Sequence, residues 1–443
     1  VAYLKPLIMQ AAEIIPEEYH STTQVFVRAT AGMRLIPKEQ RADIYDALAA
    51  GLAADEDVRL PVRRQNIGTI TGDLEAYYAA LSTNYIANRI DATLRRVPGS
   101  GPMVGALDLG GGSTQIVMYV GPEEMPPSAQ VSPEHFWSHS YLAYGVDKIR
   151  ERVADFLAAE AAAVGSPSVD HPCAHPGHEE LHDATGVTLV GSALPGDVHS
   201  CPAAMRRALW PQGACSPQGP CALDGVLTPP VRGEFYAMSV YFFALDAVRE
   251  LGPHPMKSWP RPSVRELREA AADFCGLEWA HLNATMSTAH RYTKPEQVPR
   301  RCLEAFYLGE LLHTAFGFHP ASTDVTIALE VEGREVEWTL GLALAEVAAS
   351  AEASPAPATA SSAAPGVVGQ EQLDQLLSSL REPLQNVTDA VQGLAKDVHT
   401  WAEDWGVGGV AFTALLGGAA LLVALLASQP GKRAGWWGLA AAR

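Results

Sequence analysis

Basic residues are scarce in this sequence. Its 443 residues include 32 lysines and arginines against 50 aspartates and glutamates, which gives a formal net charge of -18 at pH 7. Nucleic-acid backbones attract basic surfaces, so this charge argues against nucleic acid as a partner. A phosphorylated small molecule would have to be held by a metal ion and by backbone dipoles more than by a basic patch. The length allows two lobes with separate cores.

Cysteine is absent from the first 172 residues, and all six cysteines lie between Cys173 and Cys302. They lack the paired C-x-x-C pattern of zinc sites, and the histidines around Cys173 lie among prolines and glycines that indicate a surface loop. Disulfides formed in an oxidising compartment fit this distribution better. Two N-glycosylation sequons, at Asn283 and Asn386, agree with a lumenal or extracellular location.

Charged residues are also missing between Trp405 and Gly431. The run over residues 407–428 is almost wholly apolar, and about 20 such residues are needed to cross a bilayer as a helix. Acidic residues precede the run and basic residues follow it, and tryptophans flank both ends. We predict a single transmembrane helix, with residues 429–443 as a cytosolic tail and the rest outside the cell or in the Golgi or secretory lumen. A buried core helix is the alternative.

Two segments before this run have compositions of their own. Residues 350–370 are rich in alanine, serine and proline and predict a low-complexity linker. Over residues 371–400, leucines and valines recur at alternating steps of four and three, which predicts a juxtamembrane heptad helix. That helix could form a stalk through which the protein makes a homo-oligomer, or it could lie on its own lobe.

The segment from Gly105 to Gln115 carries the strongest chemical signal. An apolar strand ends in Asp108, and three glycines, then Ser113, Thr114 and Gln115, follow. Because glycine has no Cβ, we expect this turn to adopt positive φ and to bring backbone N–H groups close to an anion. Asp108 would face a divalent cation, and the hydroxyl and amide groups can donate to phosphate oxygens or hold a water. The segment predicts a phosphate site with a metal ion attached.

Glu75 lies in the first turn of a helix that we expect to open near Gly72. The helix dipole favours a carboxylate there, and an ionised carboxylate can accept a proton from water. By itself, Glu75 is more simply explained as an ordinary acid at a helix N-terminus. Earlier in the chain, a helix over residues 3–20 and a strand over residues 23–28 lead to Thr30, whose hydroxyl can bond a metal-bound water.

Six segments resemble, in order, the signature regions of the apyrase family, the nucleoside triphosphate diphosphohydrolases of the actin and hexokinase superfamily. They are Ala29–Leu35, Gly72–Tyr85, Leu107–Gln115, Ser138–Gly145, Gly233–Ser239 and Trp338–Gly341. The resemblance covers roughly residues 20–345. It implies an α/β fold of two actin-like (ribonuclease H-like) lobes with a central cleft. The first lobe would comprise residues 1–72 and 322–349, and the second residues 73–321.

The resemblance also implies a reaction, in which water attacks the terminal phosphoryl group of a nucleoside di- or triphosphate. Glu75 would be the general base, and Ser113 and Gln115 would orient the water. The implied phosphate contacts are Gly110, Gly111, Gly112, Ser113 and Thr114. Ca²⁺ or Mg²⁺ would be held through waters by Asp108, Thr30, Glu75 and Trp338. The candidates for stacking on the base are Tyr307, Phe242 and Phe243.

The cysteine pairing rests on the same resemblance, since six cysteines allow 15 pairings. It implies bonds from Cys173 to Cys201, from Cys215 to Cys221 and from Cys275 to Cys302.

Several departures from the family pattern keep other interpretations open. Leu74, Ala76 and Ala80 replace an acid, a glycine and a tryptophan that are usual in the family. The family's first phosphate loop is not found, and we expect it upstream of Val1, so the chain as printed is expected to hydrolyse nucleotides poorly. The alternatives are a membrane-anchored pseudoenzyme, an exopolyphosphatase-like phosphatase and a sugar kinase. The placement of Glu75 favours water over a sugar hydroxyl as acceptor.

Overall fold

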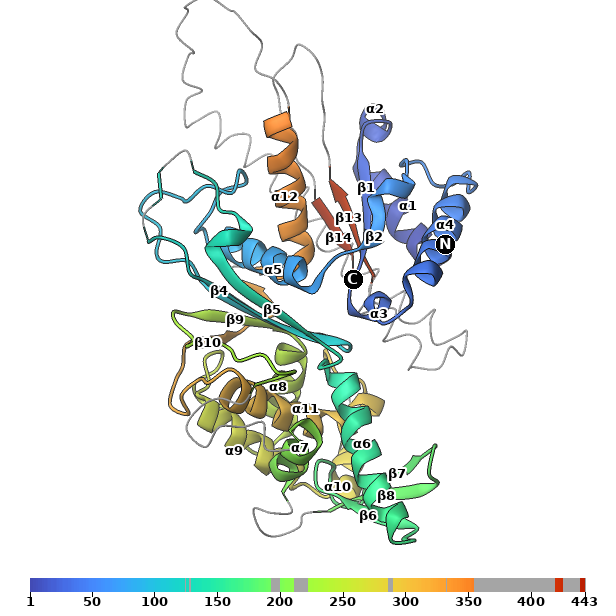
Figure 1. Ribbon diagram of the computed structural model, residues 1–443, viewed down its shortest axis with the longest axis vertical. Coiled ribbons are helices and arrows are strands. Elements are labelled where there is room, and N and C mark those ends of the chain that lie inside the picture. Colours follow the sequence, from blue (N-terminus) through green and yellow to red (C-terminus); the bar gives the residue numbers. More distant parts are fainter. Residues whose placement is uncertain are drawn as a thin grey trace, which may run out of the picture. The chain divides into compact units, whose positions relative to one another are not determined.

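The computed structural model describes residues 1–443 except 124, 127–128, 193–199, 211–221, 286–289, 332, 354–418, 425–438 and 443. The chain forms two compact units. Unit 1 comprises Val1–Ile70, Ala92–Leu94 and Leu342–Arg443, and unit 2 comprises Thr71–Asp91 and Arg95–Gly341. Both contain helices and a sheet, so the fold is mixed α/β, as the sequence predicts (Figure 1).

Unit 2 is built on a five-stranded sheet in the order β10-β9-β3-β4-β5. The strands are β3 (Gly105–Leu109), β4 (Ser113–Tyr119), β5 (Phe136–Leu142), β9 (Phe235–Ser239) and β10 (Val325–Ile327). β3, β4 and β5 form an antiparallel meander, whereas β9 and β10 run parallel to β3. Because β3 and β9 are parallel neighbours, their carboxyl ends meet at one edge of the sheet, where Leu109 pairs with Ser239.

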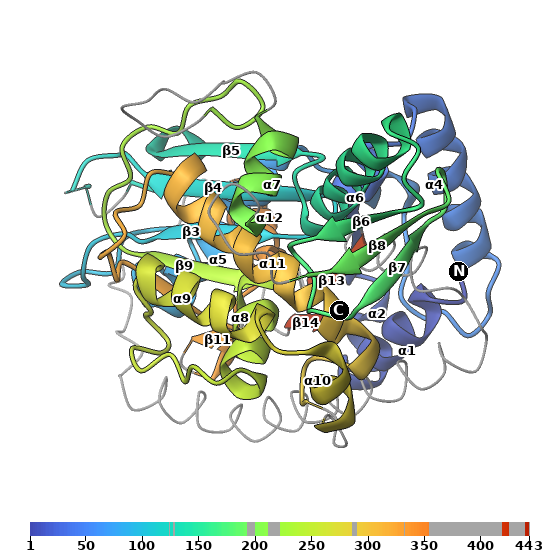
Figure 2. The same cartoon turned by 90° about the horizontal axis from the view of Figure 1, so that it is seen from below.

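Helices cover both faces of this sheet (Figures 1 and 2). Helix α5 (Gly72–Ile86) packs on β3, β4 and β5. On the other face, α8 (Val240–Leu251) packs on β3 and β9, and α11 (Val298–Glu310) packs on α8 and α9 (Val264–Cys275). Strand residues therefore alternate between the two helical layers, which is why β3 and β4 are buried along almost their whole length.

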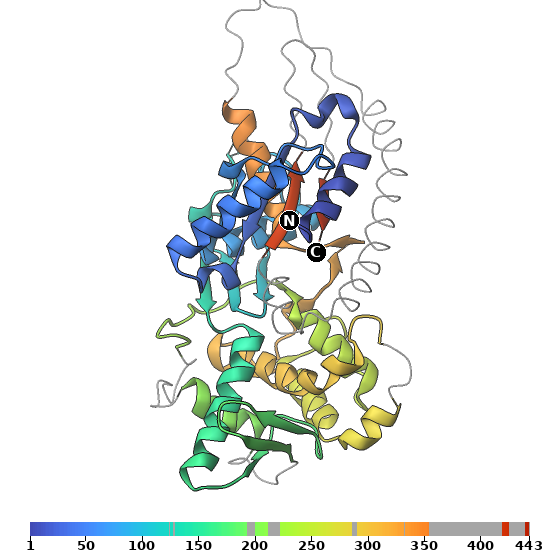
Figure 3. The same cartoon turned by 90° about the vertical axis from the view of Figure 1, so that its right-hand side faces the viewer.

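Unit 2 also contains a second, smaller sheet and several shorter elements. A three-stranded sheet in the order β6-β8-β7 packs on α6 (Val146–Ala163), as Figure 3 shows in green. The other elements are β6 (Ser168–His171), β7 (Glu179–His182), β8 (Val187–Gly191), α7 (Cys201–Leu209), α10 (Trp279–Thr285), β11 (Glu330–Val331) and β12 (Arg334–Glu335). A π-helical turn, Leu311–Ala315, continues α11.

Unit 1 has a sheet in the order β14-β13-β1-β2. Its strands are β1 (Gln24–Ala29), β2 (Ile67–Thr69), β13 (Ala419–Ala424) and β14 (Leu439–Ala442). Its helices are α1 (Leu4–Ile14), α2 (Glu17–His20), α3 (Ala31–Arg34) and α4 (Lys38–Ala53), together with α12 (Trp338–Ala353) from Leu342 onward. The apolar side of α1 packs with β1 and β2 in one hydrophobic cluster.

The two units differ from the predicted lobes in two main places, since Ala92–Leu94 belongs to unit 1 and unit 2 continues past residue 321. The prediction returns to the first lobe at residue 322, whereas unit 2 continues to Gly341. The reason is that β10 hydrogen-bonds to β9 and completes the sheet of unit 2.

The C-terminal predictions fall mostly outside the described residues. These are the linker at 350–370 beyond Ala353, the heptad helix at 371–400 and most of the tail at 429–443. Within the predicted membrane helix at 407–428, the structure describes Ala419–Ala424, and it is strand β13, paired antiparallel with β1. An uncharged alanine, leucine and valine run suits a strand as well as a helix, and the membrane helix over residues 407–428 stays a prediction. None of the described helices has the length and hydropathy that a bilayer crossing requires.

Candidate active site

The first turn of α5 positions Glu75. The helix starts at Gly72, and the Thr71 hydroxyl caps it by accepting from the Leu74 N–H at 3.2 Å. The Glu75 N–H donates to the Thr71 carbonyl at 3.0 Å, so Thr71 holds the first helical turn through both its hydroxyl and its carbonyl group. α5 lies on β3, β4 and β5, and Glu75 is buried, with only 6% of its surface exposed.

The amide of Gln115 joins Glu75 to the sheet. Gln115 Nε2 lies 3.2 Å from Glu75 Oε2, 2.7 Å from Ser113 Oγ and 3.0 Å from Ser140 Oγ. Ser113 and Gln115 are two residues apart on β4 and so share a face, and Ser140 is the residue of β5 that pairs with Gln115. Strand alternation and register therefore assemble one acid, one amide and two hydroxyls beneath the start of α5. Three of these four residues are the catalytic group that the sequence predicts.

Thr114 points away from this group. It lies between Ser113 and Gln115 on β4 and is fully buried, and its Oγ1 donates to the carbonyl oxygen of Asp108 at 2.9 Å. The predicted phosphate contact through the Thr114 side chain therefore has no support in this geometry. The side chain ties β4 to the end of β3.

The glycine run forms the turn between the antiparallel strands β3 and β4. The Gly110 N–H donates to the Ser113 carbonyl at 3.0 Å. The carbonyls of Gly110, Gly111 and Gly112 accept from the N–H groups of Val146, Asp147 and Ala143 at 2.9, 3.1 and 2.9 Å. In a trans peptide the N–H points opposite to the C=O, so the N–H groups of Gly111, Gly112 and Ser113 point away from the start of α6. The Gly110 N–H is already used within the turn, and phosphate binding by the donors that follow it stays a prediction.

The reason for glycine in this turn differs from the sequence expectation. None of the three glycines is among the residues with positive φ in the described chain. A Cβ on Gly111 would lie 2.3 Å from Asp147 Oδ2, and a Cβ on Gly145 would lie 2.4 Å from backbone atoms of Gly111 and Gly112. Glycine is therefore needed for close approach between the turn and the N-terminus of α6.

Asp108 is the last acid of β3 and is 6% exposed. The Ser239 side chain and the Leu109 N–H hydrogen-bond to its carboxyl group, but burial outweighs them and raises the pKa of Asp108 above its ordinary value. Within the part of the chain that the structure describes, Asp108 Oδ1 has no hydrogen-bond partner. A buried carboxylate oxygen without a donor is the group that a cation or a cation-bound water would satisfy, so Asp108 fits the predicted metal role.

The other predicted metal residues lie elsewhere in the chain. Trp338 is half-buried and begins α12, whose Gly341 meets α5 so closely that a Cβ there would lie 1.8 Å from the Tyr78 carbonyl oxygen. This contact fixes the start of α12 next to the helix that carries Glu75. Thr30 is buried at the junction of β1 and α3 in unit 1, and its metal role stays a prediction.

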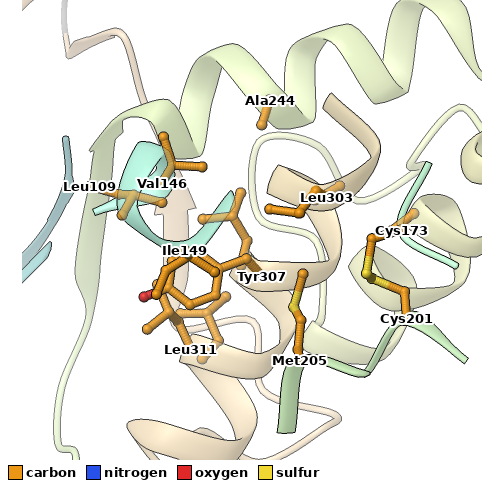
Figure 4. Packing of buried hydrophobic residues seen from close by; sticks show 14 of the residues in the cluster. Leu109, Val146, Ile149, Cys173, Cys201, Met205, Ala244, Leu303, Tyr307 and Leu311 are labelled. Carbon is orange, nitrogen blue, oxygen red and sulfur yellow. A yellow bond between two sulfur atoms is a disulfide. The ribbon is translucent and has the colours of Figure 1, made fainter. Parts of the chain in front are cut away.

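The three predicted base-stacking residues have different surroundings. Tyr307 is fully buried in the hydrophobic core, beside Ile149, Leu311 and Met205 (Figure 4), and its hydroxyl donates to the Tyr144 carbonyl at 2.6 Å. Its ring has no open face for a base, so we assign Tyr307 to the core.

Phe242 and Phe243 are half-buried, and both lie against the ring of Tyr292, with centroid distances of 5.3 and 6.3 Å. They remain candidates for base stacking.

Two of the three expected disulfides lie within the described residues, and both are formed. Cys173 bonds to Cys201, and Cys275 bonds to Cys302. Cys215 and Cys221, and the sequon at Asn386, lie outside the described residues, while Asn283 is exposed on α10.

The histidines near Cys173 take no part in a metal cluster among the described residues. Burial lowers the pKa of both His171 and His175 to about 4, and the ring of His175 stacks on Trp279.

Sequence reasoning did not single out Ser140 or Ser239 as functional residues. Both lie in segments that carry the family resemblance: Ser140 is inside Ser138–Gly145 and Ser239 is the last residue of Gly233–Ser239. The signal for Ser140 was its spacing of two from Ser138 on a strand, but which of the two faces Gln115 depends on the β4–β5 register.

Comparison with known proteins shows the family to which the chain belongs. The sequence matches the GDA1/CD39 (nucleoside phosphatase) family over residues 1–357. It is 26% identical over 369 residues to the ectonucleoside triphosphate diphosphohydrolase 8 of Mus musculus, which covers 77% of this chain and 70% of the mouse protein. It is 28% identical over 385 residues to a probable guanosine-diphosphatase of Aspergillus fumigatus, which covers 77% of this chain and 73% of the fungal protein.

A solved structure of nucleoside triphosphate hydrolases from Neospora caninum aligns with a TM-score of 0.52 and 15% identity, over 74% of this chain and 73% of that chain. This likeness concerns the fold alone. The family match spans most of the sequence, and the chain therefore belongs to the GDA1/CD39 (nucleoside phosphatase) family. It is a nucleoside phosphate hydrolase, which confirms the resemblance to the apyrases.

Proposed function

We propose that the protein hydrolyses nucleoside tri- or diphosphates with a divalent metal ion, by attack of water on the terminal phosphoryl group. The mouse relative is named an ectonucleoside triphosphate diphosphohydrolase and the fungal relative a probable guanosine-diphosphatase, and these names support this substrate class. Phosphoryl transfer depends mainly on positioning and charge neutralisation, so a site of fixed polar groups suffices for the chemistry.

The observation that carries the proposal is the hydrogen bond between Glu75 and Gln115. It places a buried carboxylate at 3.2 Å from an amide that also reaches Ser113 and Ser140. In the proposed reaction Glu75 accepts the proton of the attacking water, while Ser113 and Gln115 orient that water. The N–H groups of Gly111, Gly112 and Ser113 bind the phosphate oxygens.

Ca²⁺ or Mg²⁺ would neutralise the phosphate charge, since both prefer oxygen ligands and Mg²⁺ usually keeps several of its waters. In the proposal Asp108 holds those waters through its unpartnered Oδ1, with Thr30, Glu75 and Trp338 as further contacts. Phe242 and Phe243 are the proposed stacking partners of the base.

We also propose a lumenal or extracellular location. The two disulfides support it, because such bonds persist in oxidising compartments. Attachment to a membrane through residues 407–428 stays a prediction from their composition, and the structure describes only Ala419–Ala424 of this run, as a strand.

The test is Glu75→Gln in the full-length protein, with phosphate release measured for a panel of nucleoside di- and triphosphates in Mg²⁺ and Ca²⁺. Losing a general base should lower kcat by about 10²- to 10⁴-fold, with little change in KM. Asp73→Asn is the matched control, because Asp73 is an exposed acid in the same helical turn and the charge change is the same. A Glu75→Gln enzyme that keeps wild-type kcat would contradict the proposal. A wild-type protein that releases no phosphate from any of these nucleotides would favour the pseudoenzyme.

A further inference from the structure

Ser239 has an unusual backbone conformation. It is the last residue of β9 and the N-cap of α8, with a φ of 60° and a ψ of -124°. Positive φ is uncommon outside glycine, and such conformations cost on the order of 1–3 kcal/mol and tend to occur at functional sites.

The hydroxyl of Ser239 is not used to cap α8. Serine is a preferred N-cap residue because its oxygen accepts from the first turn, but here the side chain makes no capping hydrogen bond. The hydroxyl instead hydrogen-bonds to the carboxylate of Asp108 on the neighbouring strand.

The backbone conformation explains how this contact arises. Ser239 pairs with Leu109 and Met238 pairs with Asp108. In a regular strand the side chain of residue 239 would share the face of Leu109, which lies in the core shown in Figure 4, opposite to the face of Asp108. Departure from strand dihedrals at Ser239 allows the hydroxyl to reach Asp108.

Beside the contact with Ser239, the Asp108 carboxylate has one oxygen without a hydrogen-bond partner among the described residues. Only 6% of the Asp108 surface is exposed, and the oxygen that has no hydrogen-bond partner in the described chain is Oδ1. Asp108 is thus contacted from the side of β9 and α8, while its Oδ1 is buried without a hydrogen-bond partner in the described chain.

We infer that Ser239 is a positioning residue for the metal site: its hydroxyl fixes the rotamer of Asp108, so that Oδ1 is presented to a water of the bound divalent cation. This inference rests on the proposed function, which places Asp108 at that cation. Hydrogen bonds of this kind to a ligand commonly contribute about 10- to 100-fold to metal affinity.

The experiment measures binding of Mn²⁺, a spectroscopic substitute for Mg²⁺, to the full-length protein by electron paramagnetic resonance without substrate. Ser239→Ala removes the hydroxyl and keeps the strained conformation, and Ser239→Gly removes the hydroxyl and accepts positive φ without strain. Both should raise the Kd for Mn²⁺ by about tenfold or more, and both should need more Mg²⁺ for half-maximal activity while kcat at saturating Mg²⁺ changes little. Ser239→Gly keeps the test open if Ser239→Ala does not fold.

Ser82→Ala is the matched control. Ser82 is a fully buried serine of the same unit whose hydroxyl has no partner among the described residues, so its loss should leave Mn²⁺ binding unchanged. Asp108→Asn tests the proposed metal site separately from the role of Ser239. Unchanged Mn²⁺ binding in Asp108→Asn would overturn the proposed metal site itself.

Loss of Mn²⁺ binding in Asp108→Asn together with wild-type affinity in both Ser239 variants would overturn the inference alone. Weak binding in Ser239→Ala with normal binding in Ser239→Gly would assign the effect to backbone strain, and would also overturn the role given to the hydroxyl.

Discussion

Strands β3 and β9 are parallel neighbours, and both end at the edge of the sheet where the site lies, but they end in different ways. β3 runs into three glycines, none of which has positive φ, whereas β9 ends in a serine that does. At the turn, a Cβ on Gly111 would meet the Asp147 side chain of α6, and a Cβ on the facing Gly145 would meet the backbone of Gly111 and Gly112. The serine is there for its hydroxyl, in a conformation that glycine would adopt more readily. At the end of β3 the lack of room for a Cβ therefore determines the residue type, whereas at the end of β9 the hydroxyl group of Ser239 determines it.

The largest effect should come from filling the space behind the glycine turn. In Gly145→Ala the new Cβ would lie 2.4 Å from Gly111 and Gly112 backbone atoms, which cannot rotate away. The turn must shift, and we expect about 3 kcal/mol of lost stability and about a hundredfold lower kcat. Thermal unfolding and phosphate release measure the two effects. Gly68→Ala is the control, because a Cβ there meets nothing within 4 Å. Equal behaviour of the two variants would remove close approach as the reason for Gly145.

Replacing the acid at the end of β3 should separate stability from activity. Asp108→Asn removes a buried charge that lacks a partner on one oxygen, so without metal the variant should unfold at a higher temperature, by about 1 kcal/mol of stability. The same change should abolish metal-dependent phosphate release. Calorimetry in excess chelator measures the first effect, and a lower unfolding temperature than wild type would show that Asp108 is already satisfied without a cation.

At the end of β9, two variants isolate the backbone strain. Ser239→Gly and Ser239→Ala both lose the hydroxyl, so their difference in stability reports the conformation at φ 60°. Elsewhere in a strand or helix, alanine is the more stable by roughly 0.5–1 kcal/mol. Here the order should be reversed, with Ser239→Gly more stable by about 1 kcal/mol in urea unfolding. If Ser239→Ala is instead the more stable variant, the backbone at Ser239 is not strained, and the difference drawn between the ends of β9 and β3 is lost.

The smallest effect is expected where the obstacle is a side chain. A Cβ on Gly111 would meet Asp147 Oδ2 at 2.3 Å, and that carboxylate can rotate away from its contact with Arg150. Gly111→Ala should therefore cost about 1 kcal/mol or less. The double variant Gly111→Ala with Asp147→Ala should recover part of this cost, which a double-mutant cycle measures as a coupling energy. Additive costs would indicate that the turn itself, and not Asp147, requires glycine at this position.

The resemblance to the apyrase family, and not local spacing alone, is what grouped Glu75, Ser113 and Gln115 before the structure was known, and their catalytic roles stay predictions. Glu75 in a first helical turn and Ser113 and Gln115 two apart on a strand meet as expected. Ser140 could not be assigned, because its place opposite Gln115 is set by the pairing of two strands separated by a long connection. Ser239 was missed because positive φ in a serine leaves no trace in composition. The glycine turn was predicted at the right residues, but for their dihedral freedom, since the partners Asp147 and Gly145 enter only through the packing of α6.

The amide of Gln115 gives the site a direction of proton donation. A carboxylate can only accept, so the atom that faces Glu75 is the amide nitrogen, and a nitrogen of this kind can only donate. Ser113 and Ser140 contact the same nitrogen and can act only as acceptors towards it, so its two hydrogens are shared among three acceptors, and each hydroxyl retains its own proton to donate elsewhere. The two serines are thus oriented alike, because each hydroxyl directs its own proton away from Gln115. A phosphate oxygen or a water arriving among them would meet donors on the serine side and, at Glu75, the group that takes the proton.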